Sequence, residues 1–526
     1  MAKIGKNILE NLTTGMYSDS KVTYREYVQN ACDQIDKAIK AGIVTEETAE
    51  VSIFIDKQKR YILIEDNATG VREKDFVEQL GDIANSDKKI GEDKGFRGIG
   101  RLCGLAYCRT LVFTTSFSDE PVGSRMTFDA KLMREMLISE KKYTVDEILD
   151  RIVTTETFNE AKASHYFKVE LIDINQENTD LLDDASVRDY LTFVAPVPYT
   201  NKFRFRQEIY EHAKSLGFTI DEYKIMVNGA QLFKEYKTRL YEGADNSKKA
   251  YDDIFGVDFK DFYDDKQLIA WCWYGLSRFE KAIPKALNPM YGFRLRQGNI
   301  QIGDNAVVAP LFKEDRGNSY FVGEIFAVDR NLIPNSQRNY FNETSARIKL
   351  EEQLRVFFYE KLHRLYHVAN ETKNHYKKLE AFNEAVERYQ EKSDKGFVDE
   401  TEQARMEAAV AEARKKKDIA KKKLEKTVEV LPTTGELTPE QRVQKEIQYT
   451  YEKKKDVVKT TKSAEKKETE IVGKQEEKKT KYFTDNLSKL DKSKRKLVGQ
   501  IMGIVSQIAP EDIAEEIKAA IEKEFR

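Results

Sequence analysis

The character of the sequence changes near residue 371, and this change limits what the chain can fold into. Beyond it, Gly, Pro and aromatic residues become sparse and Lys, Glu, Ala and Gln dominate, as in ARMEAAVAEARKKKDIAKKKLEK. The segment VLPTTGELTPEQ (430–441) interrupts this run with two prolines and a glycine, which end helices. We therefore expect two long helical arms joined by a turn, pairing as an antiparallel coiled coil. Because apolar heptads are sparse, a partly disordered arm is the alternative.

Helical and strand patterns alternate before residue 371. A helix is expected over 23–42, ending at Gly42, and a strand hairpin over 51–56 and 60–66. RTLVFTTSF and FKVELIDI have the pattern of further strands, so this part predicts an α/β sandwich and no regular βαβ repeat. A second unit, rich in aromatic residues and turn signals, is expected over 185–345, followed by an amphipathic helix over 345–370. The fold class is therefore α+β, with domains at 1–180, 181–370 and 371–526.

The composition narrows the class of protein. The net charge is −2, and no stretch of 18 or more apolar residues or apolar signal region occurs, so we expect an unanchored cytoplasmic protein. The four cysteines are scattered without CxxC spacing, which is typical of free thiols in a reducing compartment. The charge is uneven: residues 371–500 hold 33 Lys and Arg against 26 Asp and Glu, whereas residues 1–370 have a net charge of −6.

Three polar residues share one face of the helix expected over 23–42. Glu26, Asn30 and Asp33 stand at i, i+4 and i+7, so at about 3.6 residues per turn they project from the same side. Such a stripe is usually a solvated face. A carboxylate one turn from an amide also suits the activation of water beside a hard metal ion, which prefers oxygen ligands. Both interpretations stay open on this stretch alone.

A second candidate site follows the strand at 60–66. Asp66 ends that strand, and Asn67, Ala68, Thr69 and Gly70 come next. A carboxylate at this place can accept a hydrogen bond from an exocyclic amine, and Gly70 permits a positive φ or a close backbone approach. The alternative is an ordinary turn from strand to loop.

A third candidate site is the glycine-rich stretch GFRGIGRLCGLAYC (95–108). Gly95, Gly98 and Gly100 have the spacing GxxGxG and precede what we expect to be a buried helix. Unpaired N–H groups and the helix dipole at such a helix start favour an anion. The stretch lacks the Gly-Lys-Ser/Thr of a Walker A loop and the GxGxxG order of dinucleotide-binding folds.

Taken in this order, the three stretches resemble the GHKL superfamily of ATPases, named for gyrase, the large heat-shock chaperone, histidine kinases and MutL. REYVQNACDQ is similar to the ExxxNxxD motif of that superfamily, DNATG to its DxGxG motif, and GFRGIG to its GxxGxG motif. The resemblance is clear over residues 20–175 and weaker to residue 345. It implies a Bergerat-type α/β sandwich that binds ATP with Mg²⁺ and hydrolyses it.

The resemblance implies a role for each matching residue. Glu26 would be the general base that activates water, Asn30 would hold Mg²⁺, and Asp33 would support the nucleotide pocket. Asp66 would bind the adenine amine, with Gly70 lining the pocket. The residues that would bind the phosphates are Lys94, Gly95, Gly98, Ile99 and Gly100.

The sequence departs from the family pattern in two places. Ala68 replaces the first glycine of DxGxG. The Thr of the fourth family motif is not evident, because SHYFKVEL has Tyr166 and Phe167 where Gly-Thr is expected. We therefore expect the second contact to adenine to be altered or mediated by water. The resemblance also implies a mobile ATP lid over residues 71–94.

The stretch DRNLIPNSQRNYF (329–341) resembles the catalytic loop in the second domain of the heat-shock chaperones. Carried over, Arg338 would reach the γ-phosphate when the domains close, where a fixed cation neutralises developing charge. The alternative is an arginine in a surface turn.

Among members of the superfamily, two functions remain. A histidine kinase is not expected, because none of the five His lies near residue 23, where the first nucleotide-binding motif begins. A gyrase or a MutL endonuclease is not expected either, because the helical arm matches neither the DNA-cleaving domain of gyrase nor the endonuclease domain of MutL. One function is a MORC-like clamp that closes around double-stranded DNA, with bacterial genome defence as a setting. The other is a chaperone-like ATPase acting on a protein client or partner effector.

The run RKKKDIAKKKLEK (414–426) favours the DNA clamp, because lysines that neutralise phosphates drive non-specific DNA binding. The alternative is that these lysines only solvate a coiled coil. In both functions we expect a homodimer whose N-terminal heads meet when ATP binds, held together by the C-terminal arm.

Overall fold

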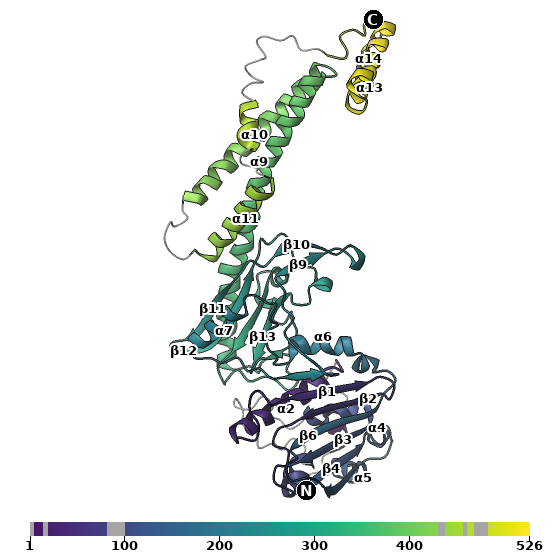
Figure 1. The fold of residues 1–526 in the computed structure, drawn as a ribbon, viewed down its shortest axis with the longest axis vertical. Coiled ribbons are helices and arrows are strands. Elements are labelled where there is room, and N and C mark those ends of the chain that lie inside the picture. Colours follow the sequence, from purple (N-terminus) through teal and green to yellow (C-terminus); the bar gives the residue numbers. More distant parts are fainter. Residues whose placement is uncertain (1–4, 14–18, 82–99, 430–436, 456–459, 468–481) are drawn as a thin grey trace. The chain divides into compact units, whose positions relative to one another are not determined.

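The structure, a computed structural model, describes residues 5–13, 19–81, 100–429, 437–455, 460–467 and 482–526. It divides into two compact units, Met1–His363 and Arg364–Arg526, which are described separately (Figure 1). The division falls inside a long helix, seven residues before the predicted start of the arm. The predicted boundary near residue 180 stays a prediction.

An eight-stranded sheet organises the start of the first unit. Its strand order is β5-β4-β3-β6-β2-β1-β7-β8, and every pairing is antiparallel except the parallel pairing of β1 with β7. The strands are β1 Val51–Asp56, β2 Tyr61–Asp66, β3 Cys108–Ser116, β4 Val122–Asp129, β5 Val153–Asn159, β6 Tyr166–Ile174, β7 Ile225–Val227 and β8 Ala230–Gln231. Strands close in sequence and strands far apart thus share one sheet, which Figure 1 shows side by side.

Helices cover one face of this sheet. The long helix α2 (Val22–Lys40) packs against β1 and β2, α4 (Ala130–Ile138) against β3, and α5 (Val145–Ile152) against β4. Burial alternates along the strands as period-2 side chains require: Val51, Ile53 and Ile55 are buried, whereas Phe54 between them is 47% exposed. This mixed sheet with one helical layer is the α/β sandwich that the sequence predicts.

Helix α2 ends as its sequence predicts. Gly42 has φ +72°, and its N–H donates to Ile39 O at 3.0 Å while Ile43 N donates to Ala38 O at 2.9 Å. This pattern is a Schellman-type cap, which needs the left-handed conformation that glycine adopts without strain. The short helices α1 (Asn7–Leu12) and α3 (Glu73–Gly81) complete this part. The helix expected after Gly100 is instead a 3₁₀ helix, Gly100–Ala106, and Cys108 already begins β3.

A second sheet forms the rest of the first unit. Its order is β11-β12-β15-β13-β14, with β13 parallel to β15. The strands are β11 Gly256–Asp264, β12 Gln267–Leu276, β13 Gly292–Gln297, β14 Ile300–Ile302 and β15 Val322–Ala327, and a separate ribbon pairs β9 Arg239–Glu242 with β10 Lys249–Asp253. Helices α6 (Asp184–Val194), α7 (Arg206–Ser215) and α8 (Ser345–Phe357) accompany it. Its core is aromatic, with Trp271 stacked on Phe326 at 4.5 Å between ring centroids.

A fully buried charged group lies at the centre of this second core. Glu324 on β15 accepts hydrogen bonds from Tyr236 Oη at 2.9 Å and from Lys234 Nζ at 3.2 Å, and it also pairs with Arg296. Arg296 donates in turn to Phe193 O, the end of α6, at 2.8 Å. Buried charges are tolerated only when they are paired. The network therefore holds the segment after β8, which carries Lys234 and Tyr236, and the end of α6 against the second sheet.

The second unit is helical, as the sequence predicts, but its first arm breaks earlier than expected. Helix α9 (His363–Lys395) ends at Gly396, which has φ +102°, and α10 (Glu400–Glu429) begins after Asp399, whose carboxylate accepts Glu402 N at 2.8 Å. The predicted interruption at 430–441 agrees with the helix bounds, since α10 ends at Glu429 and α11 begins at Pro439. The turn at 396–399, made by a glycine and a capping aspartate, is a further break that no proline marks in the sequence.

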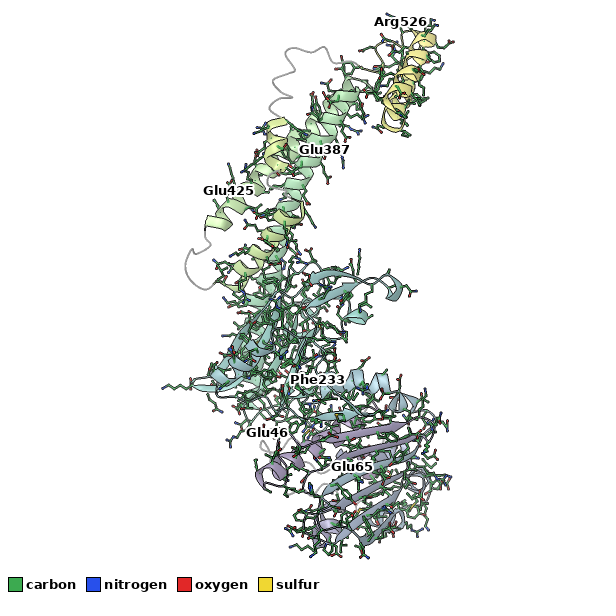
Figure 2. All side chains as sticks on the ribbon, viewed as in Figure 1. Glu46, Glu65, Phe233, Glu387, Glu425 and Arg526 are labelled. Carbon is green, nitrogen blue, oxygen red and sulfur yellow. The ribbon has the colours of Figure 1, made fainter. Side chains whose placement is uncertain are left out.

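Helices α9 and α10 pack antiparallel. One cluster joins Phe382 and Val386 of α9 to Val410 of α10, and a second joins Leu379 to Ala420. Glu387 and Glu425, labelled in Figure 2, lie on the exposed faces of the two helices. The second unit also contains α11 (Pro439–Lys455), α13 (Lys492–Ile508) and α14 (Glu511–Phe525), and residues 460–467 are helical as well.

Within the described ranges, no helix is both long enough and apolar enough to cross a bilayer. The four cysteines are buried free thiols. Burial raises the pKa of Cys108 to about 12, so this thiol stays protonated and unreactive.

Candidate functional site

Helix α2 brings the three polar residues of its motif to one face, and that face is buried. Glu26 is 8% exposed and Asp33 3% exposed, while Asn30 between them is half-buried. The interpretation of this stripe as a solvated face is therefore wrong. Gln29 lies on the same side of the helix, one turn after Glu26, and its side-chain carbonyl oxygen is buried without a hydrogen-bond partner.

Arg25 holds the carboxylate of Glu26. Its Nη2 lies 2.9 Å and its Nε 3.3 Å from Glu26 Oε1, and both side chains are nearly buried. The same Nη2 donates to the backbone carbonyl of Gln337 at 3.3 Å. A single guanidinium thus joins the start of α2 to a loop more than three hundred residues later. Arg25 was not among the predicted site residues, although it directly precedes Glu26 in the sequence.

The glycine-rich stretch ends against the same carboxylate. A Cβ placed on Gly100 would lie 2.3 Å from Glu26 Oε2, so a larger residue there would displace the Glu26 carboxylate from this position. The other implied residues of this stretch, Lys94, Gly95, Gly98 and Ile99, lie outside the described residues. The predicted lid over 71–94 falls partly there too; its described part contains α3, whose Phe76 and Leu80 are buried in the core.

The loop that carries Arg338 lies against α2 through Arg25. Pro334 pairs with Phe341 in an isolated bridge, and Arg338 N donates to Asn335 O at 3.1 Å. Arg338 has φ +54° and is 7% exposed, and its carbonyl accepts Gly303 N at 2.8 Å. The interpretation of Arg338 as a surface-turn arginine is therefore wrong, because the residue is buried in a constrained loop next to the residue that touches Arg25.

Asp66 ends β2 as a buried carboxyl group. It is 4% exposed, and burial raises its pKa to about 7, partly opposed by a hydrogen bond from Ala68 N at 3.1 Å. Nearby Glu65 adds a smaller upward contribution to the pKa. A buried carboxyl with only one neutral donor nearby favours a ligand that offers a further donor to its ionised form.

The turn after Asp66 needs its glycine. Gly70 has φ +69°, and a Cβ there would lie 1.9 Å from Ser116 O at the end of β3. Thr115 fixes the next residue: its Oγ1 accepts Val71 N at 2.9 Å and donates to Tyr166 O at 2.8 Å. The turn is thus tied to the neighbouring strands on both sides.

His165 was also missed by the sequence analysis. Its Nδ1 lies 2.9 Å from the carbonyl oxygens of both Asn67 and Ala68. Because both partners are acceptors, the proton is on Nδ1, and the imidazole holds the turn from the far side. A histidine just before β6 gave no signal in sequence, since the turn that it supports is almost a hundred residues away.

The fourth family motif remains altered. Phe167 pairs directly with Asp66 across β6 and β2, and Thr115 pairs with Phe167 across β3 and β6. Paired residues of neighbouring strands point to the same face of a sheet, so Thr115 stands in the row of Asp66, two strands away. Thr115 is the hydroxyl residue of that row that lies nearest to Asp66 in strand order, ahead of Ser124 on β4 and Thr157 on β5.

The described residues form no cluster of three or more His, Cys, Asp or Glu side chains that could hold a metal by themselves. A divalent cation held with substrate phosphates needs only one or two protein oxygens. The Asn30 amide one turn from Glu26, the bare backbone at Gly100 and the unpartnered Gln29 oxygen fit such a nucleotide-bound Mg²⁺.

Comparison with known proteins assigns the first part of the chain. A family model described as histidine kinase-, DNA gyrase B-, and HSP90-like ATPase matches residues 20–163. The chaperone protein HtpG of Orientia tsutsugamushi (strain Boryong) is 32% identical over 91 residues, covering 16% of this chain and 14% of that protein. HtpG of Wigglesworthia glossinidia brevipalpis is 27% identical over 172 residues, covering 29% and 26%.

The matched stretches therefore span only about a seventh to a quarter of the length of these relatives. The range matched by the family model includes the α2 motif, the Asp66 turn and the glycine-rich stretch, which are the residues that carry the site described above. Residues 20–163 of this chain form an ATPase domain of the histidine kinase-, DNA gyrase B- and HSP90-like family, the GHKL superfamily.

Proposed function

We propose that the chain is a Mg²⁺-ATP-dependent conformational clamp. Its N-terminal domains pair when ATP binds and separate after hydrolysis to ADP and phosphate. The observation that carries the proposal is the double contact of Arg25, which joins Glu26 to the loop of Arg338. Arg25 therefore links the ATPase domain to the loop that follows the second sheet. A clamp that couples hydrolysis to movement requires such a link.

In the proposed mechanism, Glu26 is the general base that takes a proton from the attacking water. Arg25 orients this carboxylate, and Gly100 leaves room beside it for the substrate. Arg338 neutralises charge developing on the γ-phosphate, a kind of contribution worth several kcal/mol in phosphoryl transfer. Asn30 would hold Mg²⁺, which when bound would supply charge neutralisation for the phosphates.

Adenine recognition is assigned to the turn after β2. Asp66 accepts the exocyclic amine of adenine, and the donor favours the ionised form of a carboxyl whose burial otherwise raises its pKa to about 7. Gly70 and Asp33 line the same pocket. The glycine-rich residues Lys94, Gly95, Gly98 and Ile99 are proposed to bind the phosphates together with Gly100.

For the target of the clamp, we propose double-stranded DNA, as in a MORC-like ATPase, with genome defence in the cytoplasm as the setting. Six of the eight Lys and Arg in residues 414–426 of α10 are exposed, which supports a phosphate-binding strip. The other two support the alternative: Lys417 is buried and pairs with Glu465 at 2.8 Å, and Lys421 pairs with the same carboxylate at 3.2 Å.

The second candidate is a chaperone-like ATPase that acts on a protein client or a partner effector. The HtpG matches favour it, although they cover only 14% and 26% of the length of those two chaperones.

The test is ATP hydrolysis by the wild-type chain and by Glu26→Ala, each with and without long double-stranded DNA at low salt. Turnover that DNA raises and the mutation abolishes supports the DNA clamp. Turnover that needs Glu26 but ignores DNA supports the chaperone-like function. Equal turnover by both proteins would refute the assignment of the site.

A further inference from the structure

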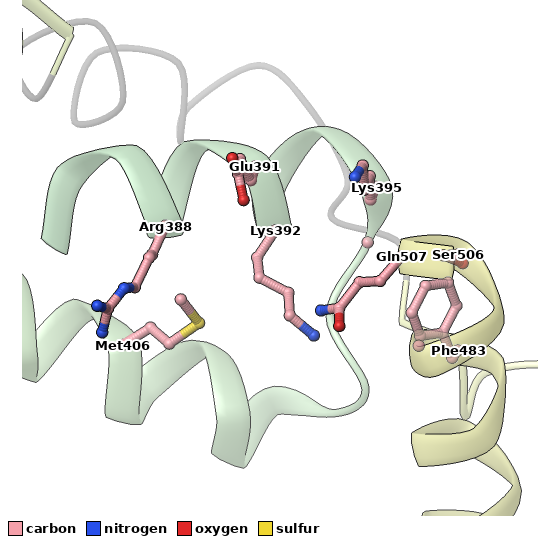
Figure 3. Close-up of a pocket in the computed structure, with 10 residues that line it drawn as sticks. Arg388, Glu391, Lys392, Lys395, Met406, Phe483, Ser506 and Gln507 are labelled. Atoms are coloured by element: carbon pink, nitrogen blue, oxygen red, sulfur yellow. The ribbon is translucent and has the colours of Figure 1, made fainter. Parts of the chain in front are cut away.

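A cavity of about 440 Å³ lies inside the second unit, where three segments of the chain meet (Figure 3). The last two turns of α9 supply one part of its lining, α10 a second part, and α13 with the residues before it a third. Sites for small ligands have volumes of roughly 300–1,000 Å³, so the cavity is large enough to hold one. None of its lining residues belongs to the site proposed for ATP.

The segments around the cavity are held to one another by direct contacts. Phe483 N donates a hydrogen bond to Phe397 O at 2.9 Å, directly after the end of α9. The hydroxyl group of Tyr482 donates to Gln403 Oε1 on α10 at 2.6 Å. Phe483 also packs with Val398 in one buried apolar cluster. The cavity is therefore part of a packed arrangement in which the distances between its lining residues are fixed.

Three cations line the cavity from one face of α9. Arg388, Lys392 and Lys395 stand at i, i+4 and i+7, so they project from the same side of the helix. Glu384 accepts a hydrogen bond from Arg388 at 3.4 Å, and Glu402 pairs with Lys392 at 3.1 Å. A guanidinium group has five N–H donors and an ammonium group three, so both cations keep donors for a ligand.

The other segments add apolar and neutral polar groups to the lining. Phe483 is 9% exposed, and Met406 on α10 is half-buried. Gln507 on α13 offers an amide group that can donate and accept hydrogen bonds. Figure 3 shows Lys392, Met406 and Gln507 pointing toward the same space from α9, α10 and α13. The cavity thus combines a cationic side with an apolar side, which suits an anion that carries an apolar body.

The alternative is that the three cations only neutralise the carbonyl end of α9. A helix end carries about half an elementary charge, which one cation is sufficient to balance. The turn at 396–399 also brings the start of α10, with the opposite partial charge, next to this end. Glu391 is the one carboxylate among the described residues that line the cavity. Three cations on one face therefore exceed what the end of the helix requires.

We propose that this cavity binds a small organic phosphate monoester. Its phosphate contacts Arg388, Lys392 and Lys395, and its planar apolar body lies against Met406 and Phe483. A phosphate monoester offers three acceptor oxygens to the three cations and fits the planar fork of arginine, whereas a carboxylate offers two oxygens. A planar body can also stack on the ring of Phe483. This inference goes beyond the proposed function and does not depend on it.

The first test uses 1-naphthyl phosphate, a monoester with a planar apolar body, titrated with the full chain without nucleotide and followed by ligand-observed NMR. Binding is expected with a Kd on the order of 1 mM, as for other ligands of this size. Naphthalene-1-acetate, which has the same body with a carboxylate, and inorganic phosphate, which has no body, should bind at least about tenfold more weakly. Equal binding of either one, or no binding of 1-naphthyl phosphate, would overturn the proposal.

The place of binding is tested with variants at exposed positions, where folding should be kept. Arg388→Ala combined with Lys395→Ala removes two of the three cations and should raise the Kd at least about tenfold. Gln507→Trp fills the cavity from α13 without changing these cations and should also weaken binding. Lys377→Ala combined with Lys422→Ala, at exposed lysines of α9 and α10 outside the cavity, is the matched control and should bind as the wild type does. Unchanged binding in both cavity variants would overturn the proposal, because the probe would then be bound elsewhere.

Discussion

The contact between Gly100 and Glu26 gives a direct test of the proposed catalytic geometry. In Gly100→Ala, the backbone N–H is kept but the new Cβ would lie 2.3 Å from Glu26 Oε2, and an ordinary contact begins at 3.4 Å. The carboxylate must therefore move by about 1 Å. A displacement of about 1 Å at a reacting group costs about 100-fold in rate, or about 2.7 kcal/mol of barrier. We expect kcat for ATP to fall by this factor.

Affinity for the nucleotide should fall less than kcat, because the Gly100 N–H proposed to face the phosphates is kept and the nearest atoms met by the new methyl group all belong to Glu26. The assay is steady-state ATP hydrolysis together with equilibrium binding of a non-hydrolysable ATP analogue. Gly5→Ala is the control, since a Cβ there meets nothing within 4 Å. Wild-type turnover in Gly100→Ala would show that the carboxylate need not stay where the structure has it, and would refute the reasoning.

Three further predictions concern the same domain. Gly70→Ala should lower the local stability of β2 and β3, measured by hydrogen exchange, by about 2–5 kcal/mol, since it combines a contact at 1.9 Å with φ +69°. Gly42→Ala, with φ +72° but open space, should cost about 1 kcal/mol, and equal losses would contradict the argument. Because burial raises the pKa of Asp66 from 3.8 to about 7, the native state keeps a proton that the unfolded chain loses, so the melting temperature should fall as pH rises through this window. Asp66→Asn should remove that part of the slope, and an unchanged slope would refute the assignment. Arg25→Lys keeps the charge but loses the planar fork that spans Glu26 and the Gln337 carbonyl, so kcat should fall about tenfold with little change in KM, and an unchanged kcat would exclude the bridging role.

Local patterns predicted most of the elements. The apolar spacing of 23–42 gave α2 with its end at Gly42, and the alternating runs gave β1, β2, β3 and β6 within a residue or two. Periodicity was sufficient because each element buries one regular face. It failed at two places where a short-range feature decided: the stretch after Gly100 is a 3₁₀ helix, and the first arm turns at Gly396, where no proline marks the break.

Residue order and spacing along the chain were enough to indicate which residues could do the chemistry. The spacing of Glu26, Asn30 and Asp33 on one helix, and the order of three motifs along the chain, were sufficient to predict a nucleotide site, because both are fixed by helix geometry and chain order. The helical spacing of Arg388, Lys392 and Lys395 on α9 is likewise visible in the residues themselves.

Which of these residues contact one another became known from the packed fold. Arg25 touches the carbonyl of Gln337, and His165 holds the carbonyls of Asn67 and Ala68, yet no local pattern links these positions. Such contacts arise when sheets and helices pack, and they depend on the register of strands far apart in sequence. Burial, which raises the pKa of Asp66, is likewise a property of the packed domain and not of the motif.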